Sequence, residues 1–357
     1  MDRLILAINP GSTSTKISLY NNEKEVFTKT LRHTNEELAP YQDVISQRHF
    51  RKEVIMKALA ENNVELSKLA IVVGRGGIVK PVESGVYAVS EEMIKDVESK
   101  KYGEHASSLG CVLAKEIAEE IGGNIPAVMV DPPVVDELEP IARVSGQKLL
   151  EKVSVFHALN QKAIAKRYAK EQGKFYKDMN LIVAHLGGGV SVSIHSKGRV
   201  IDTNDALHGE GPFSPERAGG VPALSLIDLC FSGKYTKEEV SKLINGKGGF
   251  VSYLGTNSFL EIKQRIAAGD KEAALYADAF VYQIAQYIGS MATVVSGDVD
   301  AILVTGGIAY SEEYMQKLAE RVKFIAPVHI YPGEDEMGAL ATAALALLNG
   351  EEEMKKY

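Results

Sequence analysis

The chain has 357 residues, of which 45% are hydrophobic and 24% charged, and its formal net charge is −7. The length predicts two domains and the composition a soluble globular protein, while the acidic balance argues against binding to nucleic acid. The longest nearly apolar run, residues 337–348, is shorter than the roughly 20 residues of a membrane span, and the N-terminal apolar stretch is too short for a signal peptide. Cys111 and Cys230 both lie in apolar helical sequence, so we expect free, buried thiols in a cytoplasmic protein that contacts no membrane.

The start of the chain is predicted to form strands. The apolar run at residues 4–8 indicates a buried strand, the turn Pro10-Gly11-Ser12 follows it, and residues 16–20 alternate between apolar and polar. A turn at Asn21-Asn22 leads into a third extended segment at residues 24–30. The further elements expected in this half are helices at about 47–61 and 105–121 and a buried strand at 125–130 that ends on Asp131.

The second half repeats this order. An amphipathic helix at residues 155–173 precedes "LIVAHLGGGVSVSIHSKGRVIDT", which is again strand, glycine turn, strand, polar turn, strand. The similarity to the N-terminal segment predicts two domains of one design, residues 1–150 with the C-terminal helix and tail (about 335–357), and residues 151–334. The remaining elements expected are helices at about 222–231, 236–244 and 270–295, a strand, Gly-Gly turn and helix from residue 301, a strand at 328–333, a helix at about 335–349 and a charged, frayed tail.

Three glycine turns follow apolar strands, at residues 10–12, 187–189 and 306–307. Glycine lets backbone N–H groups approach a phosphate, so three such turns favour nucleotide binding. "NPGSTSTK" comes close to a Walker A loop, with Thr15 in place of the second glycine, but a strand rather than a helix follows. "HLGGGVS" fails as a dinucleotide fingerprint for the same reason. The P-loop and Rossmann interpretations are therefore excluded by context.

The segments "NPGSTSTK", "HLGGGVSVS" and "VTGGIAYS", in this order, resemble those of the acetate kinase family, within the actin, Hsp70 and sugar kinase superfamily. The resemblance implies an α/β fold of two duplicated, ribonuclease H-like domains with the active site in the cleft between them. "HLGGG" lacks the asparagine of acetate kinases and "VVGRGG" is a shortened motif. These departures resemble the butyrate kinase branch of the family. The implied reaction is reversible transfer of the γ-phosphoryl of ATP to the carboxylate of butyrate, or of a similar short or branched fatty acid, giving acyl phosphate and ADP.

A carboxylate acceptor is ionised at neutral pH, so this transfer needs charge neutralisation and positioning rather than a general base. Guanidinium groups suit that task. Arg75 and Arg217 match the paired active-site arginines of the family, and His157 matches a histidine that stabilises the transition state. His185 is implied to hold a phosphate oxygen, and Asp131 to fix an arginine or a metal-bound water. His105 is a further candidate, for orienting other groups.

The resemblance also implies sites for nucleotide and metal. Asn9 and Glu336 match the Mg²⁺-region pair, although Glu334 and Asp335 compete for the second position. The residues implied to bind nucleotide or phosphate are Ser12, Ser14, Lys16, His185, Gly187, Gly188, Gly189, Gly306, Gly307 and Ile308. Ser258-Phe259-Leu260 stands where the family has Asp-Phe-Arg near the purine, so the adenine contacts stay open.

Three alternatives stay open at this point. An acetate or propionate kinase would use the same motifs with another chain length. A non-enzymatic, ATP-driven binding protein like the chaperone or actin members would need a partner-binding appendage, which the sequence does not display. A sugar kinase would require a carboxylate base, for which Asp131 is the candidate. The family resemblance further implies a homo-oligomer built from dimers.

Overall fold

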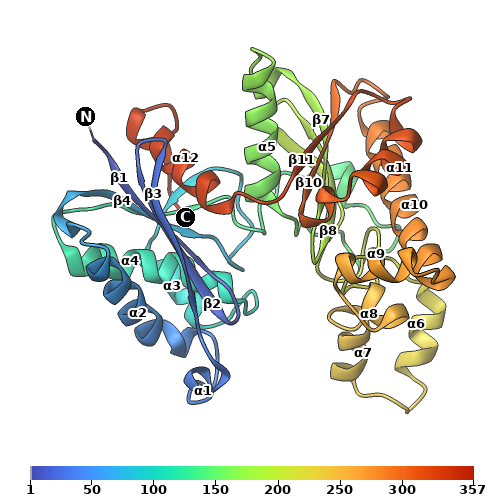
Figure 1. Cartoon of the computed structure of the whole chain (residues 1–357), viewed down its shortest axis with the longest axis horizontal. Helices are drawn as coiled ribbons and strands as arrows, with labels where there is room; N and C mark the ends of the chain where they lie inside the picture. The colour runs from blue at the N-terminus through green and yellow to red at the C-terminus, as the bar shows by residue number, and fades with distance from the viewer. Residues whose placement is uncertain (1) are drawn as a thin grey trace. The chain divides into compact units, whose positions relative to one another are not determined.

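Two β-sheets, each covered by helices, organise the protein in a computed structural model that describes residues 2–357 (Figure 1). The described chain forms two compact units. The first unit comprises residues up to Val135 together with Asp335–Tyr357, and the second comprises Asp136–Glu334. Residues 136–150, which the sequence analysis assigned to the N-terminal domain, belong to the second unit. The α/β class with two sheets is confirmed.

The sheet of the first unit has the strand order β12-β5-β6-β4-β1-β2-β3. Its strands are β1 (Leu4–Pro10), β2 (Ser14–Asn21), β3 (Lys24–Arg32), β4 (Leu69–Arg75), β5 (Val86–Ala88), β6 (Ala127–Val130) and β12 (Met354–Lys355). Strand β1 runs antiparallel to β2 and parallel to β4, and it is almost entirely apolar because it lies in the middle of the sheet. The hairpin register pairs Asn9 with Lys16 and Pro10 with Thr15. The predicted strand–turn–strand order at the N-terminus is confirmed.

The helices of the first unit pack on this sheet, α4 on β4 and α12 on β1. They are α1 (Asn35–Leu38), α2 (Arg48–Glu61), α3 (Glu91–Glu98), α4 (Leu109–Ile121) and α12 (Glu336–Asn349), with short 3₁₀ turns at Ile45–Gln47, Leu66–Lys68 and Ala106–Ser108. The start of α4 approaches β4 very closely. A Cβ on Gly74 would lie 2.0 Å from the carbonyl oxygen of Gly110, and a Cβ on Gly77 would lie 2.3 Å from Ser108. The glycines around Arg75 are therefore needed for helix–strand packing.

The C-terminal tail does not fray, so that prediction was wrong. Strand β12 pairs with β5 at the edge of the sheet. The Lys355 ammonium donates to the carbonyl of Ser84 at 2.7 Å, and the Tyr357 hydroxyl accepts from the backbone N–H of Lys80 and donates to Asp96. The charged composition suggested solvation, but Lys355 and Tyr357 each bind a partner on the loop before β5.

The sheet of the second unit has the order β11-β10-β7-β8-β9. Its strands are β7 (Asn180–Leu186), β8 (Val190–Ser196), β9 (Arg199–Thr203), β10 (Ala301–Gly306) and β11 (Val328–Pro332). Strands β7, β8 and β9 form antiparallel neighbours, whereas β10 lies parallel to β7 and to β11. This is the strand–glycine turn–strand–turn–strand order that the internal repeat predicts.

The helices of the second unit include α5, which packs on β7, and α10, which packs on β8 (Figure 1). They are α5 (Ala158–Glu171), α6 (Ala223–Cys230), α7 (Lys237–Ile244), α8 (Gly249–Leu254), α9 (Phe259–Ala267), α10 (Lys271–Val294) and α11 (Glu312–Val322), with 3₁₀ turns at Pro140–Arg143, Tyr176–Asp178 and Gly307–Tyr310. Phe250, Phe280 and Ile288 lie in the core between α10 and the sheet. None of the helices among residues 2–357 combines the length and apolar character that crossing a bilayer requires.

The two cysteines differ. Cys111 is buried in α4, where burial raises the pKa of its thiol to about 12, so it is inert as a nucleophile. Cys230 is exposed, which corrects the expectation that both thiols are buried. The reason is that α6 buries none of its residues within the chain, and its apolar side chains face solvent.

Candidate active site

The first glycine turn joins β1 to β2 and is held from behind by a buried arginine. Arg51, on α2, is 1% exposed, and its Nη1 donates to the carbonyls of Gly11 (2.8 Å) and Ser14 (2.9 Å). Its Nη2 donates to the carbonyl of Ser12 at 2.9 Å. Since a carbonyl and the following N–H point in opposite directions, these contacts turn the N–H groups of Ser12 and Thr13 away from Arg51. The turn therefore presents backbone donors on its outer side, with a cation behind them.

The Arg51 guanidinium is neutralised by no ion pair among the described contacts; its other partners are Gln47 and the hydroxyl of Thr15. Burial lowers its pKa to about 10, which still leaves it charged at neutral pH. Lys16 follows the turn, exposed and directly across the hairpin from Asn9. Ser12 is exposed and Ser14 half-buried, so the predicted phosphate contacts of the turn all lie at the surface of the first unit.

Asn9, Arg75 and Glu336 meet beside this turn. The Arg75 Nη1 lies 2.8 Å from Glu336 Oε1 and 3.3 Å from Asn9 Oδ1, and Asn9 Nδ2 donates to Glu336 Oε2 at 2.5 Å. Each comes from a different element: the end of β1, the end of β4 and the start of α12. The predicted metal pair and the predicted catalytic arginine thus form one cluster in the first unit.

The three neighbouring acids occupy different environments. Glu336 belongs to the cluster just described, whereas Asp335 caps α12 by accepting from the N–H of Gly338 at 2.9 Å. Glu334 belongs to the second unit, where its Oε1 lies 3.1 Å from His185 Nε2. Of the three, Glu336 is the one that contacts Asn9.

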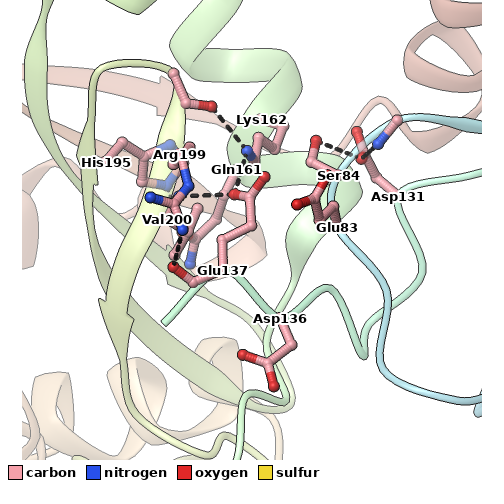
Figure 2. Close-up of polar contacts among 12 residues, drawn as sticks. Glu83, Ser84, Asp131, Asp136, Glu137, Gln161, Lys162, His195, Arg199 and Val200 are labelled. Atoms are coloured by element: carbon pink, nitrogen blue, oxygen red, sulfur yellow. Dashed lines mark hydrogen bonds and ion pairs between the residues drawn. The ribbon is translucent and has the colours of Figure 1, made fainter. Parts of the chain in front are cut away.

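Asp131 lies at the end of β6 with a backbone φ of +35°, a region that favours glycine. Its Oδ1 accepts from the Ser84 hydroxyl at 2.7 Å and from the Gly85 N–H at 2.8 Å (Figure 2). The carboxylate therefore ties the end of β6 to the loop before β5. The contact to an arginine that the resemblance implied is not among the described contacts of Asp131.

His105 precedes the 3₁₀ turn that leads into α4. Its Nδ1 accepts from the backbone N–H of Ser107 at 3.2 Å and lies 2.8 Å from the Ser107 hydroxyl. The imidazole is exposed, in the first unit. It is not brought into the Asn9–Arg75–Glu336 cluster by any described contact.

The second glycine turn, Gly187–Gly189, joins β7 to β8. Two side chains pack into the space that a Cβ of Gly189 would fill. A Cβ on Gly189 would lie 1.9 Å from the Arg217 Nη1 and 3.4 Å from the His157 ring, so only glycine leaves room for these groups. Arg217 donates to the carbonyl of Ala206 at 2.6 Å. Burial lowers the pKa of Arg217, and the carboxylates of Glu216 and Asp205 oppose that effect. The predicted arginine and glycine turn are thus in contact.

His157 and His185 are stacked, with ring centroids 4.0 Å apart. His185 is 1% exposed, its Nε2 faces Glu334, and its Nδ1 is one of the few buried side-chain atoms of residues 2–357 that have no hydrogen-bond partner. His157 Nδ1 lies 2.8 Å from the Ser191 hydroxyl. The sequence analysis treated His157 as a residue of a helix face, but it stands at the N-cap of α5, one residue before the helix.

A pocket of about 340 Å³ opens next to this turn in the second unit. Gly306, which precedes the lining residues Gly307 and Ile308, has a φ of +97°, and a Cβ there would lie 2.4 Å from the carbonyl of Leu186. Asn257 and Glu216 form a hydrogen-bonded pair at the pocket, 2.5 Å between Nδ2 and Oε1. The pocket is lined by Gly187, Gly188, Pro215, Glu216, Asn257, Phe259, Leu260, Gly307, Ile308 and Glu334.

Sequence reasoning missed Arg51, the Glu216–Asn257 pair and Ser214, whose hydroxyl donates to the Gly188 carbonyl at 2.7 Å. A signal for Arg51 did exist. The buried positions of α2 are 51, 55, 58 and 59, so Arg51 occupies the buried stripe of the helix, an unusual place for an arginine. The pair at the pocket has no comparable signal, because its two members are distant in sequence.

The residues present fit a Mg²⁺ ion. Among residues 2–357, no group of three His, Cys, Asp or Glu side chains could hold a metal. Magnesium, however, prefers oxygen ligands and retains waters, so one amide and one carboxylate suffice when substrate phosphates complete the shell. Asn9 and Glu336 can supply one oxygen each from neighbouring side chains, since Asn9 Nδ2 donates to Glu336 Oε2.

A family comparison decides where the chain belongs. The model of the acetokinase family matches residues 140–328, more than half of the chain. The chain belongs to the acetokinase family. Among similar acetokinase-family relatives, "Butyrate kinase 1" of Clostridium acetobutylicum is 56% identical over 353 residues, covering 99% of both chains. A "Probable butyrate kinase" of Clostridium botulinum is 54% identical over 357 residues, covering 100% of both.

The solved structures of the acetokinase family support the fold. A crystal structure of Porphyromonas gingivalis acetate kinase aligns with a TM-score of 0.80 at 18% identity, covering 97% of this chain and 100% of the other. At that identity the match concerns the fold alone. It confirms the α/β fold of two sheets covered by helices.

Proposed function

We propose that this chain reversibly transfers the γ-phosphoryl of ATP to the carboxylate of butyrate or a similar short or branched fatty acid, giving an acyl phosphate and ADP. The observation that carries the proposal is the contact of Arg217 and His157 with the glycine turn of β7–β8, in a chain 56% identical to a butyrate kinase. This site offers a cation and hydrogen-bond donors for phosphate, and it requires no base for an acceptor that is already anionic.

Arg217 is the group that neutralises charge on the migrating phosphoryl in this proposal. Its fork geometry suits two phosphate oxygens. His157 donates to a transition-state oxygen, and His185 faces a phosphate oxygen through its unpartnered Nδ1. Arg75 orients the carboxylate, exchanging its contact with Glu336 for the substrate. A carboxylate oxygen attacks the γ-phosphorus as the bond to the ADP oxygen breaks.

Mg²⁺ is the proposed cofactor, held by Asn9 and Glu336. When bound, the ion supplies charge neutralisation on the phosphate oxygens. Glu336 pairs with Arg75 in the structure, so a bound ion would compete with the Arg75 guanidinium for this carboxylate. Lys16, Ser12 and Ser14 add donors to phosphate from the β1–β2 turn.

The pocket of the second unit is the proposed adenosine site. Phe259 and Ile308 offer apolar surface for a purine, and the Asn257–Glu216 pair offers an amide and a carboxylate for hydrogen bonds to the base or the ribose. Gly187 and Gly307 leave the walls open for the sugar and phosphates. This assignment uses Phe259 and Leu260, which stand where the family has a phenylalanine and an arginine.

A homo-oligomer built from dimers is proposed on the exposed face of α6. Leu224, Ile227 and Phe231 are 77%, 51% and 86% exposed and share one helix face by their spacing. An apolar face of this kind usually marks an interaction surface. A cytoplasmic location is also part of the proposal, consistent with the reduced thiols.

The direct test is an assay with ATP, Mg²⁺ and a series of carboxylates, with hydroxylamine to trap acyl phosphate. We expect hydroxamate with butyrate and isobutyrate at higher kcat/KM than with acetate or propionate. Highest activity on acetate would assign the chain to acetate kinase chemistry instead. No hydroxamate with any short carboxylate, together with phosphorylation of a polyol, would replace the proposal by a sugar kinase.

A further inference from the structure

A chain of buried hydrogen bonds runs from Tyr176 through the core of the second unit to His157. The Tyr176 hydroxyl lies 2.7 Å from His195 Nδ1, and His195 Nε2 lies 3.0 Å from Gln161 Oε1. Gln161 Nε2 lies 2.8 Å from the Ser191 hydroxyl, which lies 2.8 Å from His157 Nδ1. His195, Gln161 and Ser191 are all 0% exposed, so water does not compete for these bonds.

The direction of these bonds follows from one backbone carbonyl. Gln161 Nε2 also donates to the carbonyl oxygen of Ser191 at 3.2 Å. That oxygen can only accept, so the amide nitrogen of Gln161 must face β8 and its Oε1 must face His195. Oε1 therefore accepts from His195 Nε2–H, and His195 Nδ1 accepts from the Tyr176 hydroxyl.

His195 is neutral, which is what this direction requires. Burial lowers its pKa well below the usual value, and the nearby charge of Lys162 lowers it further. Lys162 is itself fixed in the core by the Glu137 carboxylate at 2.7 Å and by the carbonyl of Gly198 at 3.0 Å (Figure 2). The neutral His195 ring carries its one proton on Nε2, so it donates to Gln161 Oε1 and cannot accept from Gln161.

The direction of these hydrogen bonds continues to His157 through the Ser191 hydroxyl. The Ser191 oxygen accepts from Gln161 and, at 3.4 Å, from the backbone N–H of His157. These two donors use both lone pairs of the hydroxyl oxygen, so the Ser191 hydroxyl proton goes to His157 Nδ1, the remaining partner among its described contacts. With Nδ1 accepting, the proton of a neutral His157 ring is on Nε2.

We propose that Gln161 is a positioning residue that, through Ser191, fixes His157 as the Nε2–H tautomer and so makes it a hydrogen-bond donor to the reacting phosphoryl group. The inference rests on the proposed function for the last step, the use of that donor in catalysis. The tautomer itself is a property of the protein without substrate. A core glutamine that only satisfies its neighbours would leave the His157 tautomer unchanged when its polarity is altered.

The sharpest test is Gln161→Glu, which keeps the size and reverses the polarity. A carboxylate accepts from both His195 and Ser191, so the Ser191 hydroxyl turns toward it and its oxygen then accepts from His157 Nδ1–H. The readout is the ¹H–¹⁵N correlation pattern of the His157 ring in protein without nucleotide, at a pH where free imidazole is neutral. We expect the Nε2–H pattern in the wild type and a proton on Nδ1 in the variant.

Turnover gives a second readout. Because Gln161→Glu turns a donor away from the phosphoryl group, we expect kcat to fall by about 10²–10³-fold, the cost of one lost transition-state donor, with little change in KM for ATP. A Gln161→Asn variant retains a neutral amide. We expect it to keep the direction of the hydrogen bonds and the Nε2–H pattern of His157, even if its kcat is lower.

A matched pair on β8 covers the case in which Gln161→Glu does not fold. Ser191 and Ser193 are both 0% exposed, on the same face of β8, and Ser193 bonds Thr203 rather than the chain to His157. Ser191→Ala should lower kcat about 10-fold and give a mixed tautomer pattern, on the scale of a lost outer-shell partner. Ser193→Ala should cost similar stability and leave both readouts unchanged.

The outcomes separate the two proposals. An Nδ1–H pattern in the wild type, or an Nε2–H pattern that persists in Gln161→Glu and Ser191→Ala, would overturn the positioning role. The expected patterns together with full activity of His157→Ala would uphold the positioning of the ring and overturn the catalytic use of His157 in the proposed function.

Discussion

The β1–β2 and β7–β8 hairpins have the same strand order and a glycine turn in the same place, yet they are built differently. The first turn carries its cation behind it, since Arg51 binds the carbonyls of Gly11, Ser12 and Ser14. The second has its cation against it, since Arg217 lies where a Cβ of Gly189 would be. The shape of the first turn is thus set by hydrogen bonds from Arg51 to backbone carbonyls. In the second turn, Arg217 occupies the space that is free because Gly189 has no Cβ.

This difference teaches where each hairpin tolerates change. In the first turn the glycine has room, because a Cβ on Gly11 would make only an ordinary contact, 3.5 Å from the Ser14 hydroxyl. In the second the glycine is indispensable, and the carbonyls are held by Ser214 and by the turn itself. The two hairpins therefore share the path of the backbone but differ in the place of the arginine. Arg51 binds the backbone carbonyls of its turn, whereas Arg217 packs at the Cβ position of a glycine.

Removing the arginine of the second hairpin should have the largest effect. Arg217→Ala is expected to lower kcat by about 10³-fold or more, because a guanidinium on a transferring phosphoryl contributes at that scale. Steady-state kinetics with ATP and butyrate measure it. Arg199→Ala removes an exposed arginine of the same unit and should change kcat less than about 2-fold. Comparable losses in both variants would show that the effect of Arg217 is general destabilisation.

Adding one methyl group tests the space at each turn. Gly189→Ala should lower kcat about 10²-fold, because its Cβ displaces the Arg217 guanidinium. Gly11→Ala, in the other turn, where a Cβ makes only an ordinary contact, should change kcat less than about 3-fold. Equal sensitivity at Gly11 and Gly189 would remove the distinction between the two hairpins.

Weakening the contacts of Arg51 with the β1–β2 turn should affect ATP binding and the free energy of unfolding. Arg51→Lys keeps the charge but cannot reach three carbonyls in a fork, so we expect about a 10-fold higher KM for ATP, a smaller change in kcat, and a loss of about 2–3 kcal/mol in the free energy of unfolding. Titration with nucleotide and chemical denaturation measure these. His33→Gln, which retains a partner for the Thr15 hydroxyl, is the matched control. An unchanged KM in Arg51→Lys would show that the turn does not depend on the guanidinium.

Acid should weaken both hairpins modestly, because each has a histidine behind it that burial keeps neutral. Burial, and then Arg51, lower the pKa of His33, and burial, and then Lys162, lower that of His195. Below about pH 6.5 the unfolded chain binds protons that these folded sites refuse, so the free energy of unfolding falls as the pH decreases. His195→Gln should reduce this slope by up to about 1.4 kcal/mol per pH unit, measured by denaturation at several pH values. A slope identical to the wild type would contradict a neutral, buried His195.

The strands, the glycine turns and the meeting of Asn9 with Glu336 could be predicted, because periodicity and a family resemblance both mark them. What could not be predicted depends on tertiary packing. The tail looked solvated by composition, and its pairing with β5 is visible only once the sheet is formed. The Cys230 thiol was expected to be buried because its helix is apolar, but α6 turns that face outward.

The interior polar residues show the same limit. Ser191, Ser193 and His195 alternate along β8 in a way that normally indicates a solvent-facing side, yet all three are buried. Their burial makes sense only with Gln161 on α5 and Thr203 on β9 as partners, which are distant in sequence. Arg51 lies in the buried stripe of α2, but which turn it holds depends on tertiary packing.

The first unit is made from the two ends of the chain, residues up to Val135 and Asp335–Tyr357, whereas the second is one continuous segment. During synthesis α12 and β12 leave the ribosome after the second unit, so β1 lacks the helix that covers it until that unit has been made. Glu336 arrives in that same final stretch. A nascent chain that ends before Asp335 therefore has the Gly187–Gly189 turn with Arg217 and His157 but lacks Glu336, the partner of Asn9 and Arg75, so the Asn9–Arg75–Glu336 cluster forms only after the second unit has been made.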